Sequence, residues 1–232
     1  MSRSPKLSVT MTHKEQVWGF LYLMLELFAL PLILDALNRL LPAPLPDVWL
    51  NFLYFALNFI FTVFLFRAFL KRCLIQTGKN VGDFLLVTAA GFGIYYGCNL
   101  VLGLLIQLLA PDFANLNDGS IAQQAEGNYA VLVVGTAILV PTAEELLHRG
   151  LVFGSLYSRN PYIAYIFSAT LFSSIHILGY IMVYPIHHLL LTFLQYLPAG
   201  LVLAWAYRKS GSIFSPILIH AAVNALALLS LR

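Results

Sequence analysis

Seven long stretches of mostly apolar residues divide the 232-residue chain, and they constrain its fold more than any other feature. A helix needs about 20 such residues to cross the hydrocarbon core of a bilayer. The stretches are Trp18–Leu37, Trp49–Leu70, Phe84–Ala110, Tyr129–Tyr157, Tyr162–Ile181, His188–Tyr207 and Ser212–Leu231. None alternates over about ten residues as the strands of a membrane β-barrel do. The sequence therefore predicts an all-α, polytopic membrane helix bundle with about seven transmembrane helices.

The composition agrees with an integral membrane protein. Hydrophobic residues make up 60% of the chain and charged residues only 10%, whereas soluble proteins average about 25% charged residues. We expect the protein to reside in the plasma membrane. The apolar stretch that begins after Gln16 has no small-residue cleavage site behind it, which indicates a retained first span. Cys73 and Cys98 form no disulfide or metal pattern and are predicted to be unpaired.

The lysines and arginines predict the orientation of the bundle, because cytoplasmic loops carry an excess of both. With the N-terminus in the cytoplasm, only Arg39 and Arg232 fall outside, and Arg149 lies within a span. The cytoplasmic set is Arg3, Lys6, Lys14, Arg67, Lys71, Arg72, Lys79, Arg159, Arg208 and Lys209. The segment Asp112–Gly127 has three acids and no basic residue, and we expect an external loop there. Since topology accounts for the basic loops, no nucleic acid partner is expected.

The ionisable residues within the spans divide the chain near Asn128. Residues 1–127 form an N-terminal transmembrane region of three spans with one buried acid, Glu26, which we expect to pair with a polar group. Residues 128–232 form four spans that contain the other intramembrane ionisable residues. A charge at membrane depth is costly and usually marks a pathway or a reaction site. The second region is therefore the expected catalytic core.

Four ionisable side chains lie within the six residues Glu144–Arg149. Glu145 and Arg149 are four positions apart, which favours an ion pair on a helix. Glu144 is rotated by about 100° from Glu145, so it can face a cavity and act as a general base. The alternative is a buried ion network that only fixes helix packing. Pro141 should kink this helix because it removes a backbone donor.

Later spans contain three further polar residues. His220 and Asn224 share a helix face and could stabilise an oxyanion, or they could simply join two helices. His176 is deep in the fifth span, where a single histidine is often a packing residue. Glu144, His176 and His220 could hold a catalytic zinc ion. In the alternative without metal, Glu144 and His176 activate water directly.

The motifs Glu144-Glu145-x-x-x-Arg149, Phe172-x-x-x-His176 and His220-x-x-x-Asn224 resemble those of the CPBP family. This family comprises the CAAX prenyl endopeptidases and the bacteriocin-processing or immunity proteins, also called Abi, and the resemblance covers about residues 128–232. It implies an intramembrane endopeptidase in which Glu144 activates water with help from His176. It further implies that His220 and Asn224 form an oxyanion hole. Glu145 and Arg149 would form an ion pair that supports the site. The motifs do not settle whether a metal such as zinc is required.

Three functions are compatible with the sequence. The first is an endopeptidase that cleaves a membrane-associated peptide or a prenylated protein near the cytoplasmic leaflet. The second is a non-catalytic bacteriocin-immunity or membrane peptide-binding protein with the same fold. The third is a proton-coupled transporter, because buried acids and histidines also form proton relays. Only the first requires Glu144 for peptide-bond hydrolysis.

Overall fold

The computed structural model describes residues 7 and 9–231, and all regular elements within that part of the chain are helices. Six helical segments are long and apolar enough to cross a membrane. They are His13–Arg39, Asp47–Leu65, Val81–Leu109, Leu116–Tyr157, Pro161–Leu178 and Ile186–Ser210. The last expected span is a shorter apolar helix, α11 (Phe214–Leu229). The predicted all-α polytopic bundle and the predicted integral membrane protein are confirmed.

Four of the six segments are single helices, namely α3 (Asp47–Leu65), α5 (Val81–Leu109), α9 (Pro161–Leu178) and α10 (Ile186–Ser210). The first segment comprises α1 (His13–Met24), the π-helical η1 (Leu25–Ala29) and α2 (Leu30–Arg39). The fourth comprises α6 (Leu116–Val134), η2 (Gly135–Leu139), α7 (Val140–Glu145), η3 (Leu146–Phe153) and α8 (Gly154–Tyr157).

The second span ends earlier than the apolar pattern predicts. Helix α3 (Asp47–Leu65) stops before Phe66, whose φ of −101° and ψ of 17° are not helical, and α4 (Arg67–Lys79) begins immediately afterwards. Arg67 and Lys71 lie in the first turns of α4. Because charged side chains are costly in hydrocarbon, the break lets the basic helix leave the direction of the span.

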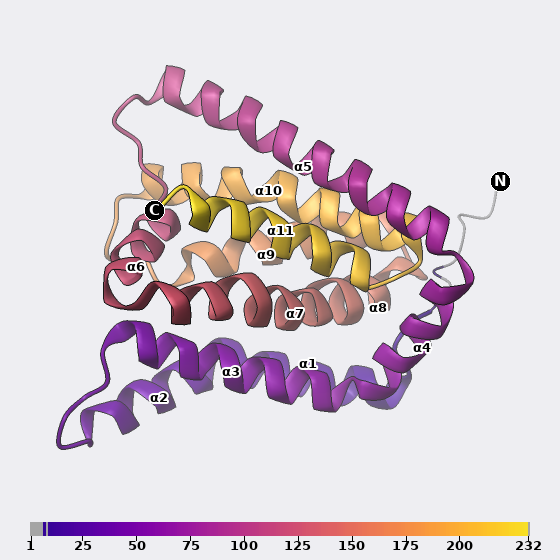
Figure 1. The fold of residues 1–232 in the computed structure, drawn as a ribbon, viewed down its shortest axis with the longest axis horizontal. Helices are drawn as coiled ribbons and strands as arrows, with labels where there is room; N and C mark the ends of the chain where they lie inside the picture. Colours follow the sequence, from indigo (N-terminus) through magenta and orange to yellow (C-terminus); the bar gives the residue numbers. More distant parts are fainter. Residues whose placement is uncertain (1–6, 8, 232) are drawn as a thin grey trace.

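The prediction of a loop at Asp112–Gly127 is wrong for most of that segment, because α6 begins at Leu116. The side chain of Asn115 caps this helix by accepting from the backbone N–H of Asn117 at 2.9 Å and of Asp118 at 3.2 Å. An acidic residue near the start of a helix stabilises that helix. The three acids of this segment were therefore not sufficient evidence for a loop. Asn128 interrupts α6 with φ −165° and ψ 93°. The segment before Asn128 is therefore a separate short helix at the end of the bundle (Figure 1).

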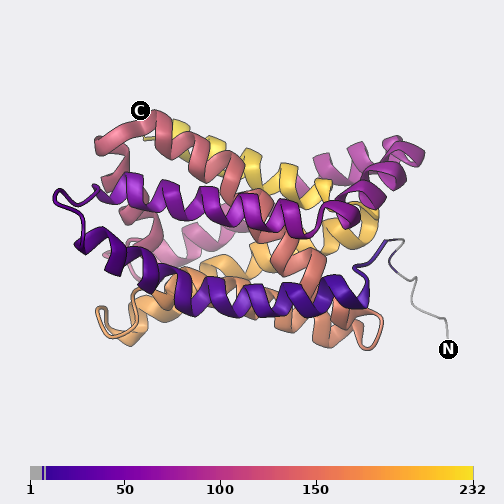
Figure 2. The same ribbon diagram turned by 90° about the horizontal axis from the view of Figure 1, so that it is seen from below.

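The helices form a layered bundle (Figures 1 and 2). Helix α5 covers one side, α10 and α11 pack beneath it, and α1 with α3 lies on the opposite side of α7. The start of α1, α4, the α8–α9 turn and the α10–α11 turn lie at one end. The α2–α3, α5–α6 and α9–α10 connections lie at the other end. The described segments that contain predicted cytoplasmic lysines and arginines thus share one end, which we call the basic end. Arg3, Lys6 and Arg232 lie outside the described residues.

Close contact between α9 and α10 positions the motif residues. A Cβ atom added at Gly200 would lie 2.6 Å from Cα of Ala169 and 2.8 Å from its Cβ. Glycine is therefore the residue that allows the two backbones to approach, as small residues do between membrane helices. Phe172, one turn beyond Ala169, is 1% exposed in the same interface.

Two π-helical segments flank the pair Glu144–Glu145. Pro141 has no N–H to donate, and instead of a simple kink the helix widens just before it, where the N–H of Val140 bonds to the carbonyl of Gly135. A second π-helical segment, η3, starts directly after Glu145. Such segments are rare and are frequently found at functional sites. The two acids therefore lie on a short α-helical turn between two irregular ones.

Candidate active site

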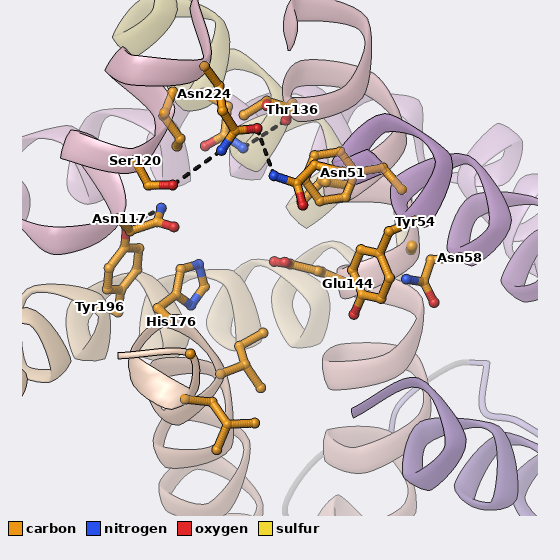
Figure 3. Close-up of a pocket in the computed structure, with 18 of the residues that line it drawn as sticks. Asn51, Tyr54, Asn58, Asn117, Ser120, Thr136, Glu144, His176, Tyr196 and Asn224 are labelled. Carbon is orange, nitrogen blue, oxygen red and sulfur yellow. Dashed lines mark hydrogen bonds between the residues drawn. The ribbon is translucent and has the colours of Figure 1, made fainter. Parts of the chain in front are cut away.

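A cavity of about 780 Å³ lies among η1–α3, α5, α6–η3, α9, α10 and α11 (Figure 3). Its polar lining residues include Glu26, Asn51, Tyr54, Asn117, Thr136, Glu144, His148, His176, Tyr196, His220 and Asn224. Glu144, His176, His220 and Asn224, the four candidate catalytic residues from the sequence, are thus all at one cavity. Glu145 and Arg149 do not line it and are buried behind it.

Glu145 and Arg149 form the predicted ion pair. Nη1 of Arg149 donates to Oε1 of Glu145 at 2.9 Å, and both side chains are completely buried. Nη2 of Arg149 also donates to the carbonyl of Gly200 at 3.3 Å, which links the pair to α10. A buried charge is tolerated only when it is paired and hydrogen-bonded. The arginine therefore neutralises one of the two adjacent acids.

Glu144 is the acid that faces the cavity. Its side chain is 23% exposed, and its Oε2 lies 4.0 Å from Nε2 of His220 without a hydrogen-bond partner. Figure 3 shows its carboxylate directed across the cavity toward His176. The two adjacent acids therefore have different surroundings, since one is neutralised by a cation and the other is available to a ligand.

His220 connects both acids. Its Nδ1 lies 2.9 Å from Oε1 of Glu145, the same oxygen that accepts from Arg149. An oxygen engaged by a guanidinium belongs to a carboxylate and can only accept, so Nδ1 of His220 must carry the hydrogen. A neutral His220 then has no N–H left for the cavity. To stabilise an oxyanion as the sequence predicts, His220 must therefore donate from Nε2 as an imidazolium.

Asn224 lines the cavity one helical turn from His220. Its Nδ2 donates to the backbone carbonyl of Thr136, in the π-helical turn η2, at 2.9 Å. A side-chain amide has two N–H groups, so one remains after this bond. The contact joins α11 to η2 and keeps the amide at the cavity wall (Figure 3).

His176 is held from two sides. Its Nδ1 lies 2.7 Å from the carbonyl of Phe172, so Nδ1 carries the hydrogen and the neutral ring offers Nε2 as an acceptor. Its ring stacks on that of Tyr196, with centroids 3.7 Å apart and planes at 20°. The Tyr196 hydroxyl accepts from Nδ2 of Asn117 at 2.9 Å. His176 therefore has a fixed orientation opposite Glu144 (Figure 3).

The ring of Phe172 contacts every other aromatic or cationic group of the motifs. The centroid distances to His148, His176 and His220 are 5.5, 4.8 and 5.7 Å. The guanidinium carbon of Arg149 lies 4.2 Å from its centroid. A desolvated cation over a ring face is attracted by about 2 kcal/mol or more. Phe172 thus packs the ion pair and the histidines into one unit.

The sequence did not single out several residues of this cavity. His148 lines it, and its Nδ1 lies 2.8 Å from the carbonyl of Glu144. Tyr54 donates to Glu26, which supplies the polar partner expected for that acid. Asn51, Tyr54 and Asn58 recur at helical spacing within an apolar span, a pattern that could have indicated a polar face. Nothing in the sequence pointed to Tyr196.

The histidines and acids do not converge as metal ligands do. Among the described residues, no group of three or more His, Cys, Asp or Glu side chains is placed to hold a metal ion. Glu144, His176 and His220 line one cavity, and because Nδ1 of both histidines is hydrogen-bonded, each ring could offer only Nε2 to an ion. In the described part of the chain these three side chains are not arranged as a zinc triad. Cys73 and Cys98 are both free.

Comparison with known proteins identifies the region that contains these motifs. Residues 126–226 match the family described as type II CAAX prenyl endopeptidase Rce1-like. The match confirms the resemblance to the CAAX prenyl endopeptidases. It covers somewhat less than half of the chain and includes every motif residue of the candidate site.

Two curated proteins are similar to parts of the chain. The UPF0177 protein YxdF of Lactococcus lactis subsp. lactis (strain IL1403) is 32% identical over 87 residues, 38% of this chain and 42% of that protein. YdiL of Bacillus subtilis (strain 168), provisionally named a membrane peptidase, is 28% identical over 95 residues, 40% of this chain and 34% of that protein. The matched segments thus span less than half the length of either relative. No solved structure gives a significant match.

Proposed function

We propose that the protein is a membrane-embedded endopeptidase that hydrolyses a peptide bond of a membrane-associated or lipidated substrate with water activated by Glu144. The observation that carries this proposal is the different state of two adjacent acids. Arg149 and His220 hold Glu145, whereas Glu144 faces a polar cavity. The match to the prenyl endopeptidase family and the provisional name of the Bacillus relative support it.

Water activation is assigned to Glu144 and His176. Their side chains lie on opposite sides of the cavity (Figure 3). A water between them would transfer one proton to the Glu144 carboxylate and direct its other hydrogen to Nε2 of His176. Its oxygen would form a bond to the carbonyl carbon of the substrate. A positioned general base of this kind contributes about 10²–10⁴-fold to a rate.

The stabilisation of the developing oxyanion is assigned to Asn224 and His220. The free N–H of Asn224 is one donor, and Nε2 of His220 is the other when the ring is an imidazolium. In that state the charges balance, since Arg149 and His220 carry two positive charges and Glu144 with Glu145 carries two negative ones. Fixed donors aimed at an oxyanion are worth about 3–4 kcal/mol each.

The second step returns the proton. Glu144 gives the proton that it took from water to the amide nitrogen, the carbon–nitrogen bond breaks, and the electron pair remains with the leaving amine. The products are a carboxylic acid and an amine, so one water is consumed for each bond cleaved. Neither step needs a further reactant.

The first experiment compares new peptide termini in membranes that contain the wild-type protein, Glu144→Gln or Glu26→Gln at equal amounts. We expect the wild type and Glu26→Gln to produce the same set of new termini. Glu144→Gln should reduce the amount of these termini by at least about 100-fold, because only Glu144 is the base. Glu26 controls for the loss of a carboxylate from the same cavity. Thermal unfolding in detergent checks that both variants fold. Identical termini in all three samples would favour the immunity or peptide-binding function.

A further inference from the structure

The cavity occupies only one half of the bundle along the helix direction. It extends from Glu144 and His148 to Gly179 and Tyr180 after α9, and to Ser230 and Leu231 after α11. Among the described residues that line it, none belongs to α4 or α8. These two helices lie at the basic end, whereas α9 and α11 finish at the opposite end (Figure 1). The cavity therefore reaches away from the basic end.

A second, smaller cavity continues toward the same end. It has a volume of about 280 Å³, and its lining includes Pro46 in the α2–α3 connection and Asp47 at the start of α3. Leu50, Asn51, Ser120 and Gln124 line both cavities. The outer cavity thus begins where the inner one ends.

Two polar contacts join three of the residues shared by the two cavities. Nδ2 of Asn51 donates to Oε1 of Gln124 at 2.8 Å, and Nε2 of Gln124 lies 3.2 Å from the hydroxyl of Ser120. Figure 3 labels Asn51 and Ser120, the two ends of this chain of hydrogen bonds, at the edge of the cavity. Side-chain amides exchange such bonds with water or a peptide at small cost. A substrate segment can therefore pass here without disrupting the packed core.

The distribution of basic residues identifies the side of the membrane. Eight described lysines and arginines belong to segments at the basic end, namely Lys14, Arg67, Lys71, Arg72, Lys79, Arg159, Arg208 and Lys209. Among the residues that the structure describes, Arg39 is the one basic residue at the opposite end. Lys and Arg accumulate in cytoplasmic loops. The end toward which the cavities extend is therefore the non-cytoplasmic one.

We infer that the cavity opens to the non-cytoplasmic side of the membrane. If the proposed function holds, its substrate is a peptide segment displayed on that side. The sequence favoured cleavage near the cytoplasmic leaflet, but the depth of a cavity depends on how helices pack and cannot be read from the position of Glu144 in its span. A peptide anchored in the cytoplasmic leaflet would have to cross to the outer half of the bundle to reach Glu144.

Cysteine labelling tests the opening directly. Ser120→Cys lies at the junction of the two cavities, and Ser158→Cys is a matched substitution in the exposed α8–α9 turn at the basic end. A membrane-impermeant maleimide should label Ser120→Cys in intact cells and Ser158→Cys only after permeabilisation. The unsubstituted protein, with Cys73 and Cys98, gives the background. Gln123→Cys, which lines the outer cavity, replaces Ser120→Cys if that variant does not fold.

Labelling of the cavity cysteine only after permeabilisation, or in neither condition, would overturn the inference. The Glu144-dependent termini give a second measurement, since the cleaved bonds should lie in segments on the non-cytoplasmic side. Cleaved bonds in cytoplasmic segments would also overturn it. If no Glu144-dependent termini appear while Ser120→Cys is labelled from outside, the proposed function fails but the opening is supported.

Discussion

Glu145 and His220 are 75 positions apart in the chain and share a hydrogen bond of 2.9 Å between Oε1 and Nδ1. The same oxygen accepts from Arg149. One carboxylate therefore joins α7 to α11 and determines which nitrogen of His220 carries the hydrogen. The orientation of His220 toward Glu144 follows from this contact, so the supporting acid controls the surroundings of the proposed base.

We expect Glu145→Gln to destabilise the protein far more than Glu144→Gln. The first substitution leaves Arg149 buried without a counter-charge, which typically costs about 3–5 kcal/mol. The second removes a carboxylate whose Oε2 has no hydrogen-bond partner. Unfolding in detergent, followed by helical circular dichroism, compares the two. Equal stability of both variants would contradict the assignment of Glu145 as the structural acid.

The stacking of Tyr196 on His176 predicts that two substitutions of Tyr196 differ in their effect on kcat. Tyr196→Phe keeps the ring and loses only the contact with Asn117, whereas Tyr196→Leu removes the stacked ring. Aromatic stacking is worth about 0.5–1.5 kcal/mol, so we expect the leucine variant to lose up to about tenfold in kcat. A change in KM should be small, because the tyrosine acts through His176. Equal kcat values for the two variants would show that stacking does not orient the histidine.

Gly200→Ala should separate α9 from α10. Its Cβ would lie 2.6 Å from the backbone of Ala169, and overpacking of this kind costs about 1–3 kcal/mol. Gly103→Ala in α5 is the control, since no atom lies within 4 Å of the added Cβ. Alanine favours a helix over glycine by up to about 1 kcal/mol, so the control should be as stable as the wild type or more so. Loss of stability in both variants would contradict the packing argument.

Chelation of metals should leave cleavage unchanged. The described His, Cys, Asp and Glu side chains form no group arranged to hold a metal ion. We therefore expect equal Glu144-dependent cleavage before and after dialysis against EDTA, with the same unfolding midpoint. Activity that is lost on dialysis and restored by zinc alone would show that Glu144, His176 and His220 rearrange around an ion.

Local spacing in the sequence predicted the parts of the site that depend on one helix. The apolar lengths indicated the membrane helices, and four-residue spacing indicated the pair of Glu145 with Arg149. The rotation of about 100° between adjacent helical residues indicated that Glu144 would face a different side of the helix from Glu145. These relationships are properties of a single helix, so they need no knowledge of its neighbours. The division into residues 1–127 and 128–232 stays a prediction.

Contacts between helices were not predictable in the same way. Tyr196 meets His176, and Glu145 meets His220, only because α7, α9, α10 and α11 pack in one arrangement. An apolar membrane helix has little amphipathic pattern to indicate which face meets which partner. The helix after Asn115 was missed for a local reason, since its acids were interpreted as a solvated loop and the asparagine cap was not considered.

The wide turn η2 has a consequence for how such a helix evolves. A π-helical turn holds one residue more than an α-helical turn, so it behaves as a single-residue insertion that the fold has retained. Because of it, Thr136 and Glu144 both border the cavity although they are eight positions apart. Deleting one residue between Thr136 and Leu139 would restore a regular helical turn and place Pro141 four positions after Thr136, where the proline ring clashes with the carbonyl that accepts from Asn224. The anchor for Asn224 would then leave the cavity wall, although every motif residue would still be in the chain.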